Sequence, residues 1–282
     1  MPASDLTNLA NVKSWLGVSD NKSDAVLSRL ISAVSAQVLA YLQRDALFSY
    51  SRTETRSGSG TGELLLRAWP VTSVASVVVD NVVIPQSIPT AGTPYPFGWA
   101  LSTYTGTPPG TNQTVSMRGW TFCRGMQNVQ VTYTAGYLVS GETTTVSSSA
   151  YTAIAPLGTW CGDSGVVFAD TGAALTAITS GTPTTGQYLV ETSSLVYPTP
   201  GTYLFSAADV GRPISLSYSY IPAALEQIVI EEIAERYKYK DRIGVRSKAL
   251  GGQETVTYDL SGLPQYVAQM LQPWRSVVPI PV

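Results

Sequence analysis

Few residues in this sequence have the types and the spacing that catalysis or metal binding requires. The 282 residues include no histidine, which removes the most common general base and metal ligand. The segment GDSG at 162–165 is similar to the nucleophile motif of serine proteases, but the triad cannot form without histidine. We therefore predict that the protein is not an enzyme and needs no cofactor and no metal.

Three further segments could be mistaken for sites. Cys123 and Cys161 are too far apart for a CxxC motif; they could form one disulfide, although two free thiols are expected in a reducing cytoplasm. The glycine-rich segment 57–63 lacks the GK[ST] ending of a phosphate-binding loop, so we predict a flexible loop over 51–62. The segment DNKSD at 20–24 lacks the glycine and glutamate of a calcium loop and predicts a helix cap.

Basic residues are concentrated near the C-terminal end. One segment holds six of the 17 lysines and arginines together with a single acid, Asp241. This basic patch could contact nucleic-acid phosphates or an acidic partner, or it could be a solvated helix end that complements the helix dipole. Its members are Arg236, Lys238, Lys240, Arg242, Arg246 and Lys248.

The C-terminal segment 273–282 is almost uncharged and rich in proline. Exposed on a monomer, it would be an adhesive surface, so it either folds back on its own core or adds a strand to a partner by β-augmentation. Together with Tyr258 and Leu260 upstream, it forms a candidate docking arm. The arm residues within the segment are Pro273, Trp274, Arg275, Val277, Val278 and Ile280.

Two N-terminal helices are predicted from apolar residues spaced three and four apart. Thr7 or Asp5 can cap the first helix, and Gly17 can end it. Asp20 or Ser23 can cap the second, whose stripe is Leu27, Leu30, Ile31, Val34, Val38, Tyr41 and Leu42. Its opposite face has small uncharged residues that could pack against a neighbouring molecule, or simply face water. These residues are Ser28, Ser32, Ser35 and Gln43.

Strands are expected between the helical ends of the chain. Val77–Val79 and Val82–Ile84 flank Asp80-Asn81, which predicts a tight hairpin. Residues 85–114 are a long loop or weakly marked strands, and strands follow at 114–117 and 129–134. From 138 to 213 the chain is rich in Thr, Ser and Gly, and short strands separated by turns predict an inserted all-β domain. The segment at 214–222 resembles the one at 129–137, which indicates two β-modules with similar closing strands or a chance likeness between two ordinary alternating strands.

A closing helix is predicted from Pro222, which suits the first helical turn, with its acidic residues before its basic ones. A last short helix at 264–271, capped by Ser261 or Gly262, should expose Val267, Met270 and Leu271. The fold class is therefore α+β, with residues 1–137 and 214–282 as a core and 138–213 as the insert.

Composition restricts the class of protein further. Apolar residues make up 44% and charged residues 13%, and the net charge is −2. Such a chain folds around a real core, and its composition is more typical of a particle protein than of a metabolic enzyme. The N-terminus lacks the pattern of a signal peptide, and the apolar run at 74–79 is too short to span a bilayer. We expect synthesis in the cytoplasm and no membrane contact.

Taken in order, these segments resemble the head–tail connector (adaptor, head-completion) proteins of tailed double-stranded DNA bacteriophages. The matching segments are Val12–Val18, Tyr41–Asp45, Leu64–Asn81, Val131–Tyr137 and Ile221–Pro264. The departure is the insert at 138–213, which short members of the family lack. The match lies in the order and spacing of the segments, since no single motif in them is as specific as a Walker A loop.

The resemblance implies a helical connector core and a structural role in the virion neck. It implies a homo-oligomeric ring, commonly of twelve copies, that docks under the portal protein and offers a surface to a stopper or tail completion protein. DNA would pass through its channel with weak or transient contact, and the basic patch and docking arm would face the DNA or the portal.

An alternative is a tail or baseplate protein whose β-insert recognises a host surface glycan. Aromatic side chains could stack on sugar rings there, although aromatics in a small β-domain more often belong to the core. The candidates are Tyr151, Trp160, Tyr188, Tyr197 and Tyr203.

Overall fold

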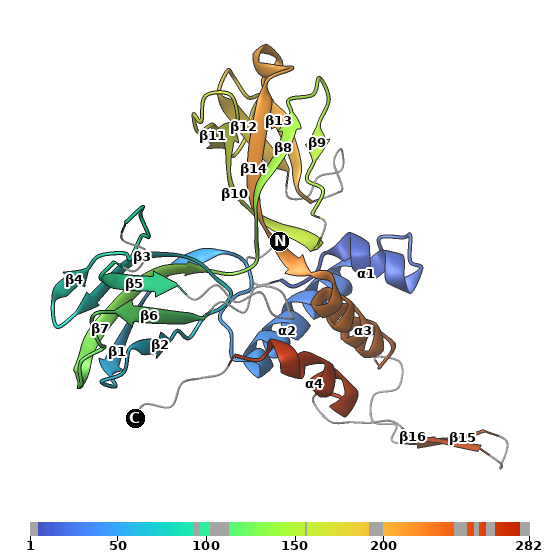
Figure 1. Cartoon of the computed structure of the whole chain (residues 1–282). Helices are drawn as coiled ribbons and strands as arrows, with labels where there is room; N and C mark the ends of the chain where they lie inside the picture. Colours follow the sequence, from blue (N-terminus) through green and yellow to red (C-terminus); the bar gives the residue numbers. More distant parts are fainter. Residues whose placement is uncertain are drawn as a thin grey trace. The chain divides into compact units, whose positions relative to one another are not determined.

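The structure is a computed structural model that describes residues 5–92, 96–101, 113–155, 157–191, 200–239, 247–250, 254–257 and 263–276. The chain forms two compact units (Figure 1). The first, called the helical unit, comprises Met1–Asp45 and Gly141–Arg275; the second, called the β-module, comprises Ala46–Ser140 and Ser276–Val282. The mixture of helices and sheets confirms the α+β class. The division into a connector core and an insert at 138–213 stays a prediction.

Four α-helices of the helical unit are α1 (Leu9–Leu16), α2 (Asp24–Leu42), α3 (Ala223–Tyr239) and α4 (Gln265–Leu271). Figure 1 shows α2 and α3 side by side. The expected stripe of α2 is confirmed, because Leu27, Val34, Val38 and Leu42 are fully buried. By length and composition alone α2 could also cross a membrane, as many core helices could.

The helix boundaries correct several expectations. The cap of α1 is Asn8, whose side chain accepts the Asn11 backbone N–H at 2.9 Å; Thr7 lies one residue before the cap position, and its hydroxyl donates to Glu226. Gly17 ends α1 in the left-handed conformation, as expected (φ 67°). Ser23 precedes α2 without a side-chain cap, and its hydroxyl is hydrogen-bonded to Tyr237 instead.

The C-terminal helices also differ from the prediction. Pro222 is the last residue of a strand, so α3 starts one residue later, directly at the strand end. Val267 and Leu271 of α4 are fully buried, and of the three apolar residues expected on its surface only Met270 is exposed. Pro264 occupies the cap position of α4; Ser261 and Gly262 lie outside the described residues.

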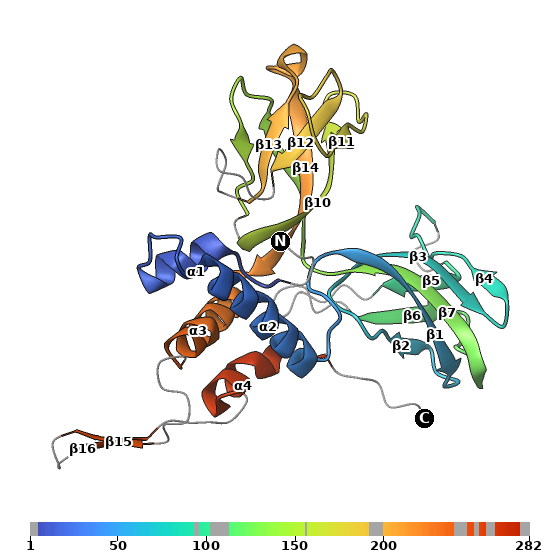
Figure 2. The same cartoon turned by 180° about the vertical axis from the view of Figure 1, so that it is seen from behind.

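The helical unit also contains two sheets and a hairpin. Strands β10 (Gly158–Phe168), β14 (Pro213–Pro222) and β8 (Leu138–Thr145) form one sheet in that order, and β14 continues into α3 (Figure 2). Strands β11 (Thr176–Ile178), β12 (Gln187–Glu191), β13 (Thr202–Phe205) and β9 (Tyr151–Thr152) form the other. Strands β15 (Ser247–Leu250) and β16 (Glu254–Thr257) pair as a hairpin, and short 3₁₀ turns occupy η1 (Ala207–Asp209) and η3 (Gln272–Trp274).

The β-module is built from two sheets around one core. Strands β1 (Tyr50–Gly58), β7 (Gly125–Ala135), β3 (Val71–Val79) and β4 (Val82–Ile84) form the larger sheet in that order. Strands β2 (Glu63–Leu65), β6 (Thr114–Arg118) and β5 (Gly98–Leu101) form the smaller. Their apolar residues, with Trp99 and Phe122 as the largest apolar side chains, form one buried cluster.

The prediction of a flexible loop over 51–62 is wrong, because Tyr50–Gly58 is the edge strand β1 paired with β7. Polar edge strands are common, since charged side chains on an edge discourage pairing with other molecules. The hairpin between β3 and β4 is confirmed, with positive φ at Asp80 (50°) and Asn81 (64°). The two strands that resemble each other, β7 and β14, each lie in the interior of their sheet.

Candidate docking surfaces

The structure describes only some residues of the basic patch. Arg236 is half-buried and pairs within its own helix with Glu232, at 2.6 Å between Nε and Oε1; it also donates to the Gln37 side chain. Its guanidinium is therefore engaged inside the helical unit. Lys238 is exposed. Lys240, Arg242 and Arg246 lie outside the described residues, and the side chain of Lys248 is not described.

The docking arm begins on two anchored residues. Arg275 is exposed, and its guanidinium lies 5.6 Å from the centre of the Tyr41 ring. Ser276 is buried in the β-module, where its hydroxyl donates to the Arg67 carbonyl at 2.9 Å. Pro273 is exposed and Trp274 half-buried. The remaining arm residues, Tyr258, Leu260, Val277, Val278 and Ile280, lie outside the described residues.

Only part of the α2 face proposed to pack against a neighbouring molecule is exposed. Ser28 and Gln43 are exposed, and Ser32 is half-buried. Ser35 is fully buried, and its hydroxyl accepts the Leu6 backbone N–H at 2.9 Å. Ser35 therefore belongs to the interior of the helical unit. A packing face on α2 is limited to the exposed residues Ser28 and Gln43.

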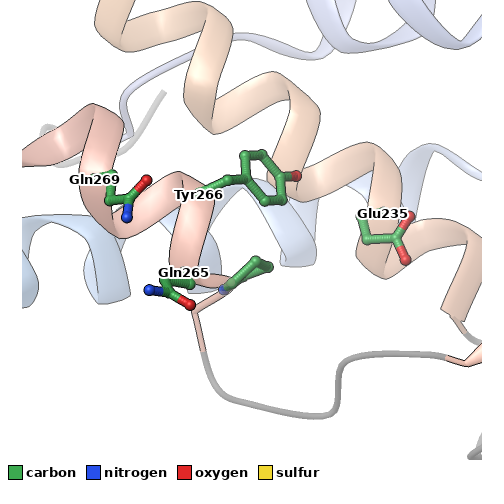
Figure 3. A pocket seen from close by; sticks show the side chains of 5 residues that line it. Glu235, Gln265, Tyr266 and Gln269 are labelled. Carbon is green, nitrogen blue, oxygen red and sulfur yellow. The ribbon is translucent and has the colours of Figure 1, made fainter.

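A pocket between α3 and α4 was missed by the sequence reasoning (Figure 3). Its volume is about 600 Å³, and Tyr266 extends from α4 toward α3, where Glu235 lies. Burial, and then the nearby Glu232 and Glu231 carboxylates, raise the pKa of the Tyr266 phenol. The only sequence signal was a tyrosine flanked by two glutamines at helical spacing after a proline. The lining residues are Glu235, Pro264, Gln265, Tyr266 and Gln269.

A buried carboxylate, also missed, joins the first and last parts of the helical unit. Glu226 of α3 is 6% exposed and accepts hydrogen bonds from Thr7 (2.8 Å) and Asn11 (2.7 Å). The Thr159 hydroxyl of β10 donates to its second oxygen. A glutamate in the first turn of a helix is favoured by the helix dipole, but only its surroundings reveal that it is buried. The arrangement is structural, because every carboxylate oxygen is already hydrogen-bonded.

The aromatic residues considered for glycan stacking are mostly core residues. Trp160, Tyr188 and Tyr203 are 5%, 2% and 0% exposed. The two tyrosine hydroxyls donate to Asp163, at 2.6 and 3.0 Å, and the tyrosine rings stack on each other. Tyr151 is half-buried and donates to Glu142. Tyr197 lies outside the described residues. Buried ring faces offer no platform to a sugar, so the expectation of a stacking site is not supported at these positions.

No cluster of three His, Cys, Asp or Glu side chains that could hold a metal occurs among the described residues. Cys123 and Cys161 are both free thiols. Burial raises the pKa of the Cys161 thiol to about 12, which makes it a poor nucleophile and a poor metal ligand near neutral pH.

These features describe an α+β protein whose candidate sites are surface segments. Residues 7–79, which span α1 to β3, match the model of the family described as phage gp6-like head–tail connector protein. Residues 7–79 are therefore similar to this family, in agreement with the resemblance drawn from the sequence.

One similar solved structure is described as "Neck of empty GTA particle computed with C6 symmetry"; it has 13% sequence identity and a TM-score of 0.41, over 99% of this chain and 93% of that chain. No curated protein matches the chain.

Proposed function

We propose that this protein is a non-enzymatic virion adaptor at the head–tail junction, forming a ring that docks under the portal and joins the capsid to the tail. The observation that carries the proposal is the connector-family match over residues 7–79, which includes both N-terminal helices and the first strands of the β-module. A ring of twelve copies, assembled after synthesis in the bacterial cytoplasm, would surround a channel for DNA.

Two features support contacts with the portal. Within the docking arm, Ser276 is buried and donates a part-buried hydrogen bond to the Arg67 carbonyl, which gives the apolar tail a fixed starting point. Lys238 adds an exposed positive charge at the end of α3. Contact with passing DNA should be weak and screened by salt, since a channel that must release DNA cannot hold it tightly. A stopper or tail completion protein would bind the opposite side of the ring, and no membrane is involved.

The β-insert at 138–213 would lie on the outer surface of the ring and widen the collar. Its buried aromatic cluster supports a structural role over glycan recognition, so the tail-tip alternative has no observation in its favour among the described residues. Particles that lack 138–213, assembled with an unchanged collar width, would contradict this placement.

The direct test is light scattering and negative-stain imaging of the purified protein, alone and mixed with portal protein. Rings, formed either in solution or only on the portal, would support the adaptor function. A discrete trimer that ignores the portal would overturn it and direct the next experiment to glycan binding.

A further inference from the structure

The outer edge of β2 in the β-module is a sheet edge that can accept a further strand. The sheet order β2–β6–β5 leaves one side of β2 without a neighbouring strand among the described residues. On the other side, the Leu66 N–H donates to the Gln113 carbonyl at 2.8 Å, and the Gly62 carbonyl also accepts a hydrogen bond from β6, at 2.7 Å. Backbone groups alternate in direction along a strand, so those of Glu63 and Leu65 point away from β6.

The backbone groups along this edge are hydrogen-bonded at one end of it. At Arg67, the N–H donates to Glu54 Oε2 at 3.1 Å, and the carbonyl accepts the Ser276 hydroxyl at 2.9 Å. The N–H and carbonyl of Leu65 form no hydrogen bond with any described residue. The Glu63 carbonyl accepts one threonine hydroxyl, at 2.9 Å, and keeps a second lone pair. The edge is therefore open to a strand that starts where Ser276 lies.

The sequence of residues 277–282 (VVPIPV) is suited to pairing on one side only. Proline has no N–H, so Pro279 and Pro281 cannot donate to a neighbouring strand. Because the two prolines are two residues apart, both missing donors lie on the same side of an extended segment. The N–H groups of Val278 and Ile280 point to the opposite side. Such a segment can pair with one sheet edge, and its prolines then discourage further pairing.

Ser276 fixes the register in which this segment can meet β2. Its hydrogen bond to the Arg67 carbonyl places it beside that residue. If the chain continues antiparallel to β2, Val278 lies opposite Leu65, two residues further along both strands. The N–H groups that then face β2 are the ones that the prolines leave intact. The register set by the anchor and the spacing of the prolines therefore agree.

We propose that residues 277–282, which lie outside the described residues, add an antiparallel strand to the outer edge of β2 in the same chain. Ile280 lies opposite Glu63 in this arrangement, and four residues on either strand span about 13 Å. The same chain supplies the strand because a single residue separates the anchored Ser276 from Val278. The arrangement belongs to the free protein and does not rest on the proposed ring. A tail held there has to leave β2 before it can bind the portal.

Amide hydrogen exchange, followed by NMR in the full-length protein, tests the pairing. The Leu65 N–H should exchange at least about tenfold more slowly than in a variant that ends at Ser276. Val278→Pro points a ring at β2 and should match the shortened variant. Val277→Pro is the matched control: it adds the same ring where the N–H faces away, and it should match the wild type. The Leu64 N–H, which faces β6, should stay protected in every variant and so report that the sheet is folded.

A disulfide distinguishes pairing within one chain from pairing between copies. Glu63→Cys with Ile280→Cys, made together with Cys123→Ser and Cys161→Ser, should form a bond within one chain on mild oxidation, because opposite residues of paired strands lie within disulfide range. In the control, Val83→Cys replaces the change at Glu63; that residue is exposed on β4, in the other sheet, and should form no bond with position 280.

Two results would overturn the proposal. The first is a Leu65 N–H that exchanges equally fast in the full-length and the shortened protein, with the Leu64 N–H still protected. The second is a disulfide between Cys side chains at 63 and 280 that joins two chains, since the strand would then come from a neighbouring copy.

Discussion

Asn11 of α1 donates a hydrogen bond to the buried carboxylate of Glu226 at 2.7 Å, across 215 residues of sequence. The Thr7 hydroxyl donates to the same oxygen at 2.8 Å, and Thr159 of β10 donates to the other. One side chain of α3 thus joins the N-terminal segment, the closing helix and the sheet of the helical unit. A buried carboxylate is tolerated because its lone pairs are used by several donors.

Replacing Glu226 with alanine should therefore destabilise the helical unit strongly. Three donors lose their acceptor: Thr7 is buried, and Asn11 and Thr159 are half-buried. A buried unsatisfied group costs about 1–3 kcal/mol and a half-buried one less, so a total loss of about 3 kcal/mol is expected. Urea unfolding followed by circular dichroism measures it. Glu231→Ala on the same helix is the matched control: it loses one hydrogen bond, from Gln227 at 2.9 Å, and should cost less than about 1 kcal/mol. Equal losses for the two variants would show that the buried network does not stabilise the fold.

In the β-module, the Tyr133 hydroxyl has a comparable role. The side chain is fully buried; its O–H donates to Glu54 at 2.7 Å and accepts the Ala68 N–H at 3.1 Å, and burial raises the pKa of the phenol. Tyr133→Phe keeps the ring and leaves these two partners without the hydroxyl. We expect a loss of about 1–3 kcal/mol in the free energy of unfolding.

The matched control is Thr53→Val, which removes a hydroxyl from the exposed pair of Thr53 with Thr132. That change should alter stability by no more than about 0.5 kcal/mol. If Tyr133→Phe has an equally small effect, water or another donor satisfies the buried groups.

The hairpin turn between β3 and β4 offers a substitution that should not lower the stability of the protein. Asn81 adopts φ 64°, a left-handed conformation that glycine reaches without steric cost. Asn81→Gly should be neutral or slightly stabilising, and Asn81→Val should lose about 1 kcal/mol or more because a β-branched residue is strained there. Thermal unfolding of both variants checks this. A valine variant as stable as the wild type would mean that the turn changes its conformation.

This hairpin was predictable because its signal is local: two valine-rich strands flank two residues that tolerate positive φ. The stripe of α2 was predictable for the same reason, since its spacing repeats over five turns. Strand β1 was not, because its polar sequence resembles a loop until β7 is known to pair with it. The burial of polar side chains and the pocket between the helices were the hardest features to predict from the sequence. The burial of Ser35 and Glu226 depends on Leu6, Thr7 and Asn11, which are distant in the sequence, and the α3–α4 pocket depends on how the two helices meet.

Asp5 should make stability depend on pH. The residue is 7% exposed, and burial raises the pKa of its carboxyl above the ordinary value of 3.8, partly offset by a hydrogen bond with Ser32. The unfolded chain therefore loses this proton first, and stability falls as the pH rises through the interval above 3.8. Asp5→Asn removes this cost and should raise the melting temperature at pH 7, with no gain at pH 3.

Ser32→Ala provides the opposite change for this prediction. Without the hydroxyl the carboxylate loses its hydrogen bond, so stability at pH 7 should fall and recover toward pH 3. Melting temperatures across pH 3 to 7 for the three proteins test the sign. An Asp5→Asn variant less stable than the wild type at pH 7 would contradict the reasoning.

The two thiols should differ in reactivity. Both side chains are half-buried, but burial raises the pKa of Cys161 to about 12, so almost no thiolate exists there at pH 8. An alkylating reagent should therefore modify Cys123 in the folded protein and leave Cys161 intact until denaturant is added, as mass spectrometry can show. Cys123→Ser should abolish labelling of the folded protein, and Cys161→Ser should leave it unchanged. Between pH 8 and 9 the slow labelling of Cys161 should rise about tenfold with the thiolate fraction. Labelling of Cys161 as fast as Cys123 at pH 8 would mean that its side chain opens to solvent.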